Sequence, residues 1–570
     1  MSILKKLTIE NFKGIGQKVS FDFKPITLFF GQNSAGKSTV LHALNYLHDI
    51  LNLHTINADN TSLGHGSIDL GGFKHFVHKH DLQRTINLSL EIDMTSQDLI
   101  ETDSANLFNE LQRLFPGEFV HGELIDLSHI SNRIETSKID IEIAWSDLLK
   151  KPYVKSLSIA FNDEPILKVV SSSTCARIEI TQINLSHSIF LGTESDDEVI
   201  YLYPLIENII QERYLSPDNS DTVILDELNI DELDLYPPDS PHKKNKLNDN
   251  ALIGLEGMQD ALPERGYNLK LQDIWEEQAW IDNPQEVSLF KSLLSLLLMG
   301  PIEVAAEELA KLRYLGPIRE IPGRDYSARQ TEGNNWSDGL AAWDALFHDG
   351  KALINEVNHW LNGETDSGKE RLATGYSVKI AEYKQLALNS QLMGLLQTED
   401  LNGSKKEIER LIEELPVEKG FLLTDKRREV DVSPEDVGIG ISQLLPVVVG
   451  AIKRDVPILS IEQPEIHIHP GLQVALGDLL IYAAKKYGKS FILETHSEHI
   501  MLRLKRRIRE TSEDELENEE YSLNPDDVNI VYVECIDDET RMLSIRLDED
   551  GDFIDRWPNG FFGERAEELF

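Results

Sequence analysis

Eight consecutive residues, from Gly31 to Ser38, have the types and spacing of a loop that binds phosphate groups. They match the pattern G-x-x-x-x-G-K-[ST] at every position. In such a loop, glycines let backbone N–H groups approach the phosphates, Lys37 reaches the β and γ oxygens, and Ser38 can hold Mg²⁺. The residues that we expect to bind the nucleotide are Gly31, Asn33, Ser34, Gly36, Lys37, Ser38 and Thr39.

This pattern is short, so its meaning depends on the elements beside it. Pro25 to Phe30 is β-branched and aromatic, which predicts a buried strand. After the loop, apolar residues recur at helical spacing from Val40 to Leu51 and predict a core-facing helix. The competing interpretation is a glycine-rich turn with a single lysine, and this strand–loop–helix context disfavours it.

Two further strands in the last third of the chain end in polar residues. The strand from Val456 to Glu462 has the form of a Walker B strand, whose acid can hold Mg²⁺. A buried strand that merely ends in Glu is the plainer interpretation, but the polar run up to Pro470 follows at the edge where open α/β sheets bind ligands. The strand from Ser490 leads to His496, which could contact a γ-phosphate or position water, although a histidine after a strand is more often structural.

Ser442 follows a glycine-containing run, Val437 to Ile441, at the start of an expected helix from Leu444 to Lys453. A helix N-terminus binds anions, so the chain contains a second anion-binding geometry but one phosphate loop. This imbalance predicts that sites are shared between subunits.

Composition limits the possible partners. The chain of 570 residues has 98 acidic and 55 basic residues, a formal net charge of -43, which repels nucleic acid on average. Any DNA contact therefore needs a local basic patch, and the run from Arg503 to Arg509 is the candidate, unless nearby acids neutralise it. The two cysteines do not form a disulfide framework, and no apolar run reaches the ~20 residues of a membrane span. We therefore expect a cytoplasmic protein without a membrane partner.

The chain is expected to contain four regions. Residues 1–190 form an N-terminal ATPase lobe with the phosphate loop and an antiparallel β region. Residues 191–285 are an acidic, partly mobile insertion, and residues 286–415 are helical. Residues 416–570 form a C-terminal ATPase lobe with the Ser442 element, the Walker B strand and His496.

Four ordered motifs together resemble the ABC-type ATPases of the SMC/RecF/OLD group. They are Leu7–Lys13, Gly438–Gln443, Ile461–Pro470 and Glu494–Ser497. The chain is most similar to bacterial stand-alone ATPases that also carry the runs Tyr314–Glu320 and Arg556–Phe562. The resemblance implies an α/β fold: a P-loop NTPase of ABC/SMC-head type with a mixed sheet, an antiparallel β lobe, and an acidic and helical middle insertion.

The resemblance also implies how the site works. Two heads would sandwich two ATP molecules with Mg²⁺ in a homodimer, and Ser442 of one subunit would face the loop of the other. Glu462 would be the Walker B acid that binds Mg²⁺ with Ser38, and His496 the switch histidine. Lys13 occupies a position where relatives often carry a basic residue near the phosphates, whereas an exposed strand-end lysine is the plainer interpretation.

One departure from the group's pattern concerns the catalytic base. A catalytic Glu usually follows the Walker B acid, but this chain has Gln463 there. An amide can orient water but cannot accept its proton, so we expect an ATPase of low turnover. Glu465, two residues on, is the other candidate for the base.

Two functions remain in competition. The first is an ATPase that regulates a partner effector, a nuclease or toxin, as the resemblance to ATPase subunits of bacterial antiphage systems implies. The chain after Asp527 is too short for the Toprim nuclease domain of OLD enzymes, so nuclease activity would lie in that partner. The second is a RecF/SMC-like ATPase that binds DNA in repair, for which nucleic acid would be the partner.

Overall fold

The computed structural model of this chain divides into two compact units. It describes residues 2–32, 35–57, 62–63, 66–67, 70–96, 132–184, 187–190, 253–266, 269–271, 284–324, 326, 336–363, 371–397, 405–537 and 539–558. Unit 1 comprises Met1–Leu312, Val528–Arg546 and Trp557–Phe561, and unit 2 comprises Arg313–Asp527, Leu547–Arg556 and Phe562–Phe570. Each unit therefore includes segments that are far apart in the sequence.

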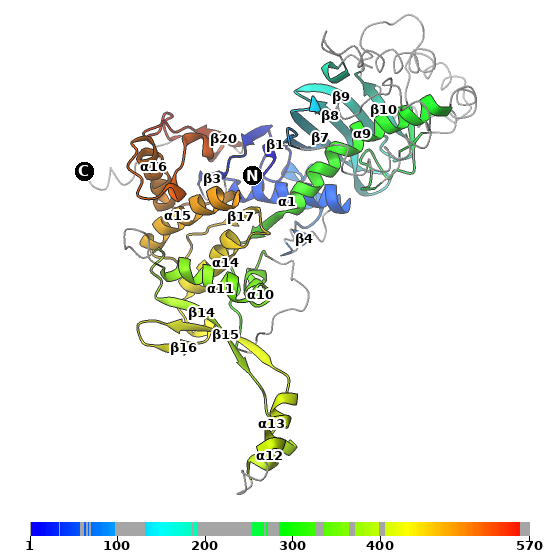
Figure 1. The fold of residues 1–570 in the computed structure, drawn as a ribbon. Helices are drawn as coiled ribbons and strands as arrows, with labels where there is room; N and C mark the ends of the chain where they lie inside the picture. Colours follow the sequence, from blue (N-terminus) through cyan, green and yellow to red (C-terminus); the bar gives the residue numbers. More distant parts are fainter. Residues whose placement is uncertain are drawn as a thin grey trace, which may run out of the picture. The chain divides into compact units, whose positions relative to one another are not determined.

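A nine-stranded sheet forms one layer of unit 1, in the order β12-β11-β10-β9-β8-β7-β6-β1-β2, and its paired strands run antiparallel. The strands are β1 (Leu4–Glu10), β2 (Val19–Asp22), β6 (Ile86–Asp93), β7 (Thr136–Ser146), β8 (Lys151–Phe161), β9 (Glu164–Ser171), β10 (Ile178–Ile183), β11 (Ile253–Glu256) and β12 (Lys270–Leu271). Buried and half-buried residues alternate along β7, as expected of a sheet with one face against a core. The helix α9 (Pro284–Ala310) packs on β7, β8 and β9 (Figure 1). The predicted antiparallel β lobe is confirmed.

The phosphate-loop strand belongs to a second, mixed set of strands in unit 1. β3 (Ile26–Gly31) runs parallel to β19 (Val528–Ile536), which pairs antiparallel with β20 (Glu539–Ile545). All six residues of β3 are buried. The helix α1 (Lys37–Leu53) follows and buries most of its residues, partly against α9. The predicted strand–loop–helix order is confirmed, as is an α/β fold with a mixed sheet.

Unit 2 contains the two strands that the sequence predicts to end in functional residues. β17 (Ile458–Glu462) and β18 (Ser490–Glu494) pair in parallel, and every residue of both is buried. β13 (Leu312–Leu315) lies beside β17. The helices α14 (Ile439–Ile452), α15 (Pro470–Tyr487) and α16 (Glu498–Ser512) pack around these strands, and α14 begins five residues before the predicted start.

Residues 286–415 contain strand as well as helix. Within the region predicted to be helical, residues 340–362 form two helices, α10 (Leu340–His348) and α11 (Gly350–Asn362), because Gly350 has a left-handed φ of 65° at the junction. β14 (Tyr376–Tyr383) pairs with β15 (Glu418–Asp425), and β15 with β16 (Val430–Val432). The predicted boundaries at 190, 285 and 415 stay predictions.

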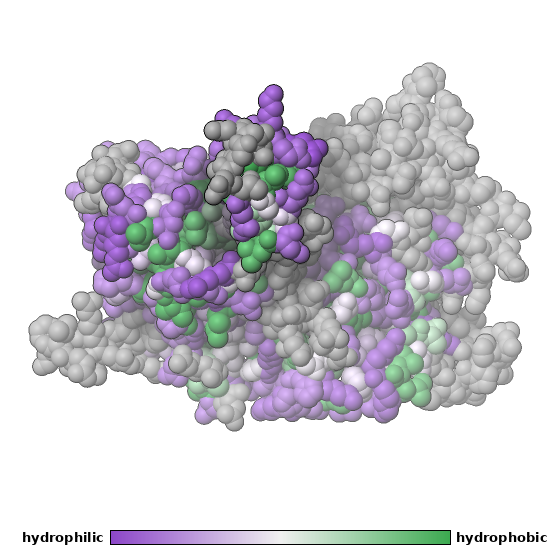
Figure 2. Space-filling model, turned by 90° about the horizontal axis from the view of Figure 1, so that it is seen from below, coloured by the Kyte–Doolittle hydropathy of each residue, from purple (hydrophilic) through white to green (hydrophobic). Residues whose placement is uncertain are grey.

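The short helices α12 (Gln391–Leu396) and α13 (Lys405–Glu414) lie beyond the end of the β14–β15 pair (Figure 1). α13 has no buried residue, and Ile412 is 40% exposed. The surface viewed in Figure 2 is mainly hydrophilic, with small hydrophobic patches. No described helix is long and apolar enough to cross a membrane. Most of the predicted acidic insertion, residues 191–285, lies outside the described residues.

Candidate nucleotide-binding site

Glycine makes the phosphate loop of unit 1 possible at both of its ends. Gly31 has a φ of 144°, and a Cβ there would lie 1.9 Å from the carbonyl oxygen of Val533 on β19. Gly36 has a φ of 105° and is the N-cap of α1. Side chains rarely adopt such backbone conformations, so the chain can turn from β3 into α1 here only with glycine. Asn33 and Ser34, two predicted phosphate ligands, lie outside the described residues.

The beginning of α1 has the properties of a phosphate site. No side chain caps this end, and its first turn contains no acidic residue. The positive end of the helix dipole, equivalent to roughly half an elementary charge, is therefore not offset locally. Ser38 is half-buried and Thr39 is buried within this turn. These residues and backbone groups fit the phosphates of a nucleotide.

Lys37 is held over the loop although its side chain is nearly enclosed. The residue is 3% exposed, and its Nζ donates to the carbonyl oxygens of Gly31, at 3.0 Å, and Gln32, at 2.8 Å. These bonds place the ammonium group at the start of the loop. A buried ammonium is stable only where strong acceptors surround it. Phosphate oxygens are stronger acceptors than carbonyls, so the geometry favours an anionic ligand.

Thr540 on β20 connects the loop to the turn after β1. Its Oγ1 lies 3.1 Å from the carbonyl oxygen of Gly14 and 3.2 Å from that of Ala35, and donates to both positions. The residue is 3% exposed. Because one hydroxyl reaches both carbonyls, the turn after β1 and the phosphate loop lie side by side. No motif marks Thr540, which is 505 residues from Ala35 in sequence, so sequence reasoning missed it.

The same turn contains Lys13, which has a left-handed φ of 49°. Its Nζ is 2.6 Å from Nδ1 of His42 on α1. Burial, together with the charge of Lys13, lowers the pKa of His42 to about 3, so His42 is neutral and its Nδ1 accepts from the ammonium. Lys13 therefore lies against α1 beside the loop and is not simply a solvent-exposed strand-end residue. Whether it contacts phosphate stays a prediction.

In unit 2, the acid at the end of β17 is fixed by residues from elsewhere in the sequence. The hydroxyl of Tyr314 on β13 donates to Oε1 of Glu462 at 2.7 Å, and Glu462 is 7% exposed. Burial and the negative charge of Glu462 raise the pKa of Tyr314, so the phenol remains the donor. A carboxylate oxygen is a ligand that Mg²⁺ accepts, so Glu462 is of the right chemical type for the predicted metal ligand.

Arg319 fixes the backbone around the same strand end. Its Nη2 donates to the carbonyl oxygen of Glu462 at 2.8 Å, and its backbone N–H donates to Oε1 of Gln443 at 3.0 Å. The residue is 1% exposed, and burial lowers its pKa to about 10. Arg319 therefore still carries a positive charge at neutral pH, close to Glu462. It lies in the run Tyr314–Glu320, which supported the resemblance without a functional role.

The polar loop after β17 connects the two parallel strands. Gln463 has a left-handed φ of 46°, and its N–H donates to the carbonyl oxygen of Glu494 at 2.7 Å. Glu465 accepts from the N–H of His496 and from the hydroxyl of Thr495, both at 2.7 Å. Burial raises the pKa of Glu465, and these bonds oppose the shift. The structure therefore brings Glu462, Gln463, Glu465 and His496 together, with Glu465 holding the segment that contains His496.

Ser442 lies in the first part of α14 but points inward. It is fully buried, and its hydroxyl donates to the carbonyl oxygen of Pro434 at 3.3 Å. Gly440 packs so closely that a Cβ would lie 2.4 Å from the carbonyl oxygen of His467, which places this helix end against the polar loop. Gly438 and Ile439 are the exposed residues here. The predicted role of Ser442 toward a partner's nucleotide stays a prediction.

The chemistry of these donors fits Mg²⁺·ATP. The loop of unit 1 supplies N–H groups, an ammonium and the hydroxyl of Ser38. In unit 2, the carboxylate of Glu462 is by itself of the type that Mg²⁺ accepts as a ligand. The loop residues would hold the phosphates, and a metal bound with them would neutralise phosphate charge.

Comparisons with protein families identify ATPase sequence at both ends of the chain. Residues 1–230 match the family described as an AAA ATPase domain. Residues 319–502 match an AAA domain described as putative AbiEii toxin, Type IV TA system. Residues 523–570 match a family described as a protein of unknown function. No curated protein matches the chain. The chain therefore contains two stretches that match AAA-family ATPase domains, in agreement with the coarser part of the prediction.

The chain shows weak similarity to several solved SMC head domains. The SMC head domain from Thermotoga maritima is 8% identical, with 95% of this chain and 99% of that chain covered and a TM-score of 0.33. The Smc head domain with a coiled coil and joint from Pyrococcus yayanosii is 11% identical, with all of both chains covered and a TM-score of 0.35. A head domain from Pyrococcus furiosus, bound to the C-terminal domain of ScpA, is 13% identical, covers 96% and 97%, and scores 0.34.

Proposed function

We propose that this chain is an ATP-binding, slowly hydrolysing ATPase that dimerises around two Mg²⁺·ATP and regulates a partner effector in bacterial antiphage defence. The observation that carries the proposal is the phosphate loop between β3 and α1. There, an uncapped helix N-terminus and a buried ammonium at Lys37 converge on one loop. Both features favour a polyphosphate over a neutral ligand.

Slow turnover follows from the residue after the Walker B acid. Gln463 cannot accept a proton from water. Glu465, the other candidate, already accepts a hydrogen bond on each carboxylate oxygen, from His496 and Thr495. ATP would therefore hold the dimer closed for longer than in an enzyme with a free carboxylate here.

Two observations support an interface and a partner. Ile439, at the N-terminus of α14, is an apolar residue that is 52% exposed. An exposed apolar side chain in the single chain is available to be buried in a contact between subunits. The match of residues 319–502 to a family described as a putative toxin of a toxin–antitoxin system supports a role with an effector. The effector itself would be a separate protein, a nuclease or toxin.

The oligomeric state in different nucleotides tests this proposal. We expect the purified chain to be a dimer by light scattering in Mg²⁺·ATP and a monomer in Mg²⁺·ADP, and Ile439→Glu to remain monomeric in both. Leu388→Glu is the matched control, because Leu388 is 83% exposed and lies on a different surface. A native chain that stays monomeric in ATP and co-purifies with no protein encoded beside it contradicts the proposal.

The competing function, DNA binding through the run from Arg503 to Arg509, receives little support. Arg507 pairs with Asp478 and Glu510, and Arg506 pairs with Glu510. These acids lie on α15 and α16. Nearby acids therefore neutralise part of the positive charge of this run, as the alternative interpretation predicts. A filter-binding series at two salt concentrations tests this function, and salt-sensitive binding lost in Arg506→Glu/Arg507→Glu would favour it.

A further inference from the structure

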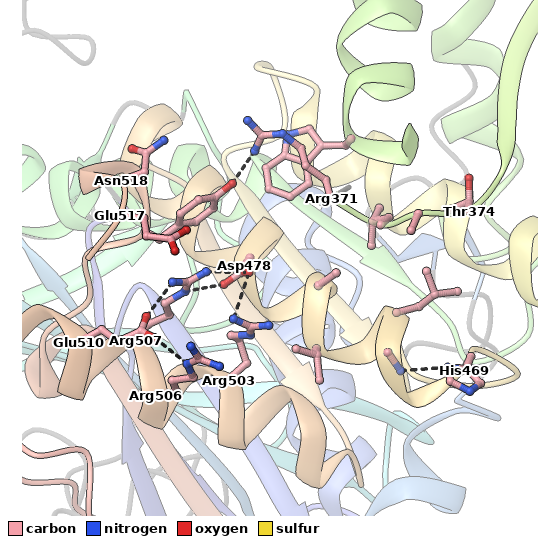
Figure 3. Close-up of a pocket in the computed structure, with 18 of the residues that line it drawn as sticks. Arg371, Thr374, His469, Asp478, Arg503, Arg506, Arg507, Glu510, Glu517 and Asn518 are labelled. Carbon is pink, nitrogen blue, oxygen red and sulfur yellow. Dashed lines mark hydrogen bonds and ion pairs between the residues drawn. The ribbon is translucent and has the colours of Figure 1, made fainter. Parts of the chain in front are cut away.

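Unit 2 contains a cavity of about 680 Å³ that the proposed ATPase does not use. It lies beside α15 and α16 and is also lined by residues that follow α11 and α16. One part of its wall is apolar and includes Leu372, Leu472 and Val474. The other is charged and contains Arg371, Arg503, Arg506, Arg507, Asp478 and Glu510. Figure 3 shows the arginines of α16 beside Asp478 and Glu510, away from Thr374 and His469. The cavity is therefore amphipathic.

The carboxylates of Asp478 and Glu510 already pair with arginines of α16. Arg507 makes a two-pronged contact with Asp478, at 2.8 and 3.0 Å, and a further bond of 2.7 Å to Glu510. Arg506 contacts Glu510 at 2.5 Å. Four guanidinium groups thus face two carboxylates, which leaves two positive charges. Glu515 and Glu517 also line the cavity, but they are exposed, so water screens their charge.

Three N–H donors at this cavity have no acceptor among the described residues. They are Nε of Arg371, Nε of Arg503 and Nε1 of Trp360. Trp360 is only 1% exposed, and Nη1 of Arg503 lies 3.6 Å from Oδ2 of Asp478, beyond hydrogen-bond distance. A buried donor without an acceptor costs about 1–3 kcal/mol. A ligand with hydrogen-bond acceptors could therefore satisfy these donors in the cavity.

Gly477 lets the side chain of Arg503 pack closely against α15. A Cβ at Gly477 on α15 would lie 2.9 Å from Cγ of Arg503. The absence of a side chain lets the arginine lie against α15, and burial lowers its pKa. An arginine held this closely against a helix is pre-organised for an anion and loses little conformational entropy when it binds.

We propose that this cavity binds a small phosphate monoester with an apolar body, such as a nucleoside monophosphate. A phosphate monoester carries a charge of about −1.5 to −2 at neutral pH, which matches the excess of the four guanidinium groups over the carboxylates of Asp478 and Glu510. Arginine forks recognise phosphate in a two-pronged geometry. The apolar wall of Leu372, Leu472 and Val474 accommodates the rest of the ligand, and a cavity of this volume is of the size that takes nucleotide-sized molecules.

A ligand here would touch both helices that follow the catalytic strands. α15 begins directly after the polar loop with Gln463, and α16 begins two residues after His496. Bound ligand would change the spacing of these helices and thereby the position of His496. This regulatory consequence rests on the proposed ATPase function, whereas the binding itself does not.

The binding test uses the full chain with Lys37→Ala, in which we expect the phosphate loop to bind nucleotide about 100-fold more weakly. Calorimetry would measure the affinity for adenosine monophosphate, inorganic phosphate and adenosine. We expect saturable binding of the monophosphate, weaker binding of phosphate and none of adenosine. Adding Arg503→Gln or Arg371→Gln should weaken the monophosphate about tenfold or more, because each removes a charge-assisted donor.

Arg454→Gln is the matched control, because Arg454 is an exposed arginine of unit 2 outside the cavity, and its affinity should be unchanged. Circular dichroism of every variant checks folding, and Arg371→Gln tests the cavity independently if Arg503→Gln unfolds. The proposal is overturned if the Lys37→Ala chain binds none of the probes, or if both arginine variants bind as the control does. Loss of ATPase activity in the native chain would instead contradict only the proposed function.

Discussion

The phosphate loop of unit 1 and the strand ends of unit 2 build ligand-binding geometry in different ways. The loop is contiguous: Gly31, Gly36 and Lys37 act within eight residues, mostly through backbone and one side chain. At the strand ends, Glu462 is held by Tyr314 and Arg319, which lie more than 140 residues earlier. A local motif can therefore be recognised from residue spacing. Where distant residues fix a site, the sequence indicates the functional residue, here Glu462, but not the partners that hold it.

The largest expected effect comes from Lys37→Ala. The change removes a charged donor from the loop, and we expect affinity for ATP to fall about 100-fold, since one or two charge-assisted bonds contribute about 3 kcal/mol. Calorimetry with ATP measures this, and Lys18→Ala, an exposed lysine of the same unit, is the control. Equal ATP affinity in Lys37→Ala and Lys18→Ala would remove the loop from the site.

Unit 2 has its own buried lysine, at the start of β18. Lys489 is 1% exposed and donates to the carbonyl oxygen of Gly450 at 2.7 Å and to that of Lys453. Burial lowers its pKa to about 7. The unfolded chain therefore binds more protons than the folded chain between pH 7 and the ordinary lysine pKa, so stability rises with pH in that window.

Between pH 7 and pH 9 this lysine should add about 2–3 kcal/mol to the free energy of unfolding. Urea unfolding at the two pH values should show that rise in the native chain and a flatter response in Lys489→Met. Lys351→Met, at an exposed position, controls for the remaining titrating groups. If both variants keep the native slope, the lysine is charged in the folded state.

Gln463→Glu tests whether the amide limits turnover. A carboxylate at this position could accept the proton of the attacking water, and we expect hydrolysis to become about tenfold faster or more. Gln463→Asn keeps the amide and suits the left-handed φ of 46°, so it should leave hydrolysis slow. Turnover is measured by phosphate release under saturating ATP. Acceleration by Asn as much as by Glu would mean that backbone conformation, not the missing base, is limiting.

Tyr314→Phe tests the remote support of the Walker B acid. Losing the bond to Glu462 should cost about 1 kcal/mol and let the carboxylate move. We expect the Mg²⁺ concentration for half-maximal activity to rise about fivefold, with ATP affinity in the absence of metal unchanged. Titration of Mg²⁺ at fixed ATP separates these quantities. Equal loss of metal-free ATP binding would indicate a general structural defect.

The most accurate sequence predictions are those of secondary-structure elements marked by short apolar runs. The strand before Gly31, the helix after Lys37 and the strands ending at Glu462 and Glu494 follow from short apolar runs, each of which packs as its own periodicity requires. Gly350 separates α10 from α11 through one left-handed backbone angle, a detail that the prediction of a helical region does not contain. Ser442 illustrates another limit, since a helix start can be read from sequence but the direction of a side chain within it cannot.

Thr540 gives the loop of unit 1 the same kind of remote partner that unit 2 uses, on a smaller scale. Thr540→Val keeps the shape of the side chain but removes the hydroxyl shared by Gly14 and Ala35. Those carbonyls would lose a donor, and we expect ATP affinity to fall about threefold, corresponding to roughly 0.6 kcal/mol. Thr540→Ser retains the hydroxyl and should bind ATP as the native chain does. If Thr540→Val also binds ATP normally, the loop is positioned by its own residues alone. The two regions would then differ fully, because only Glu462 would depend on partners distant in sequence.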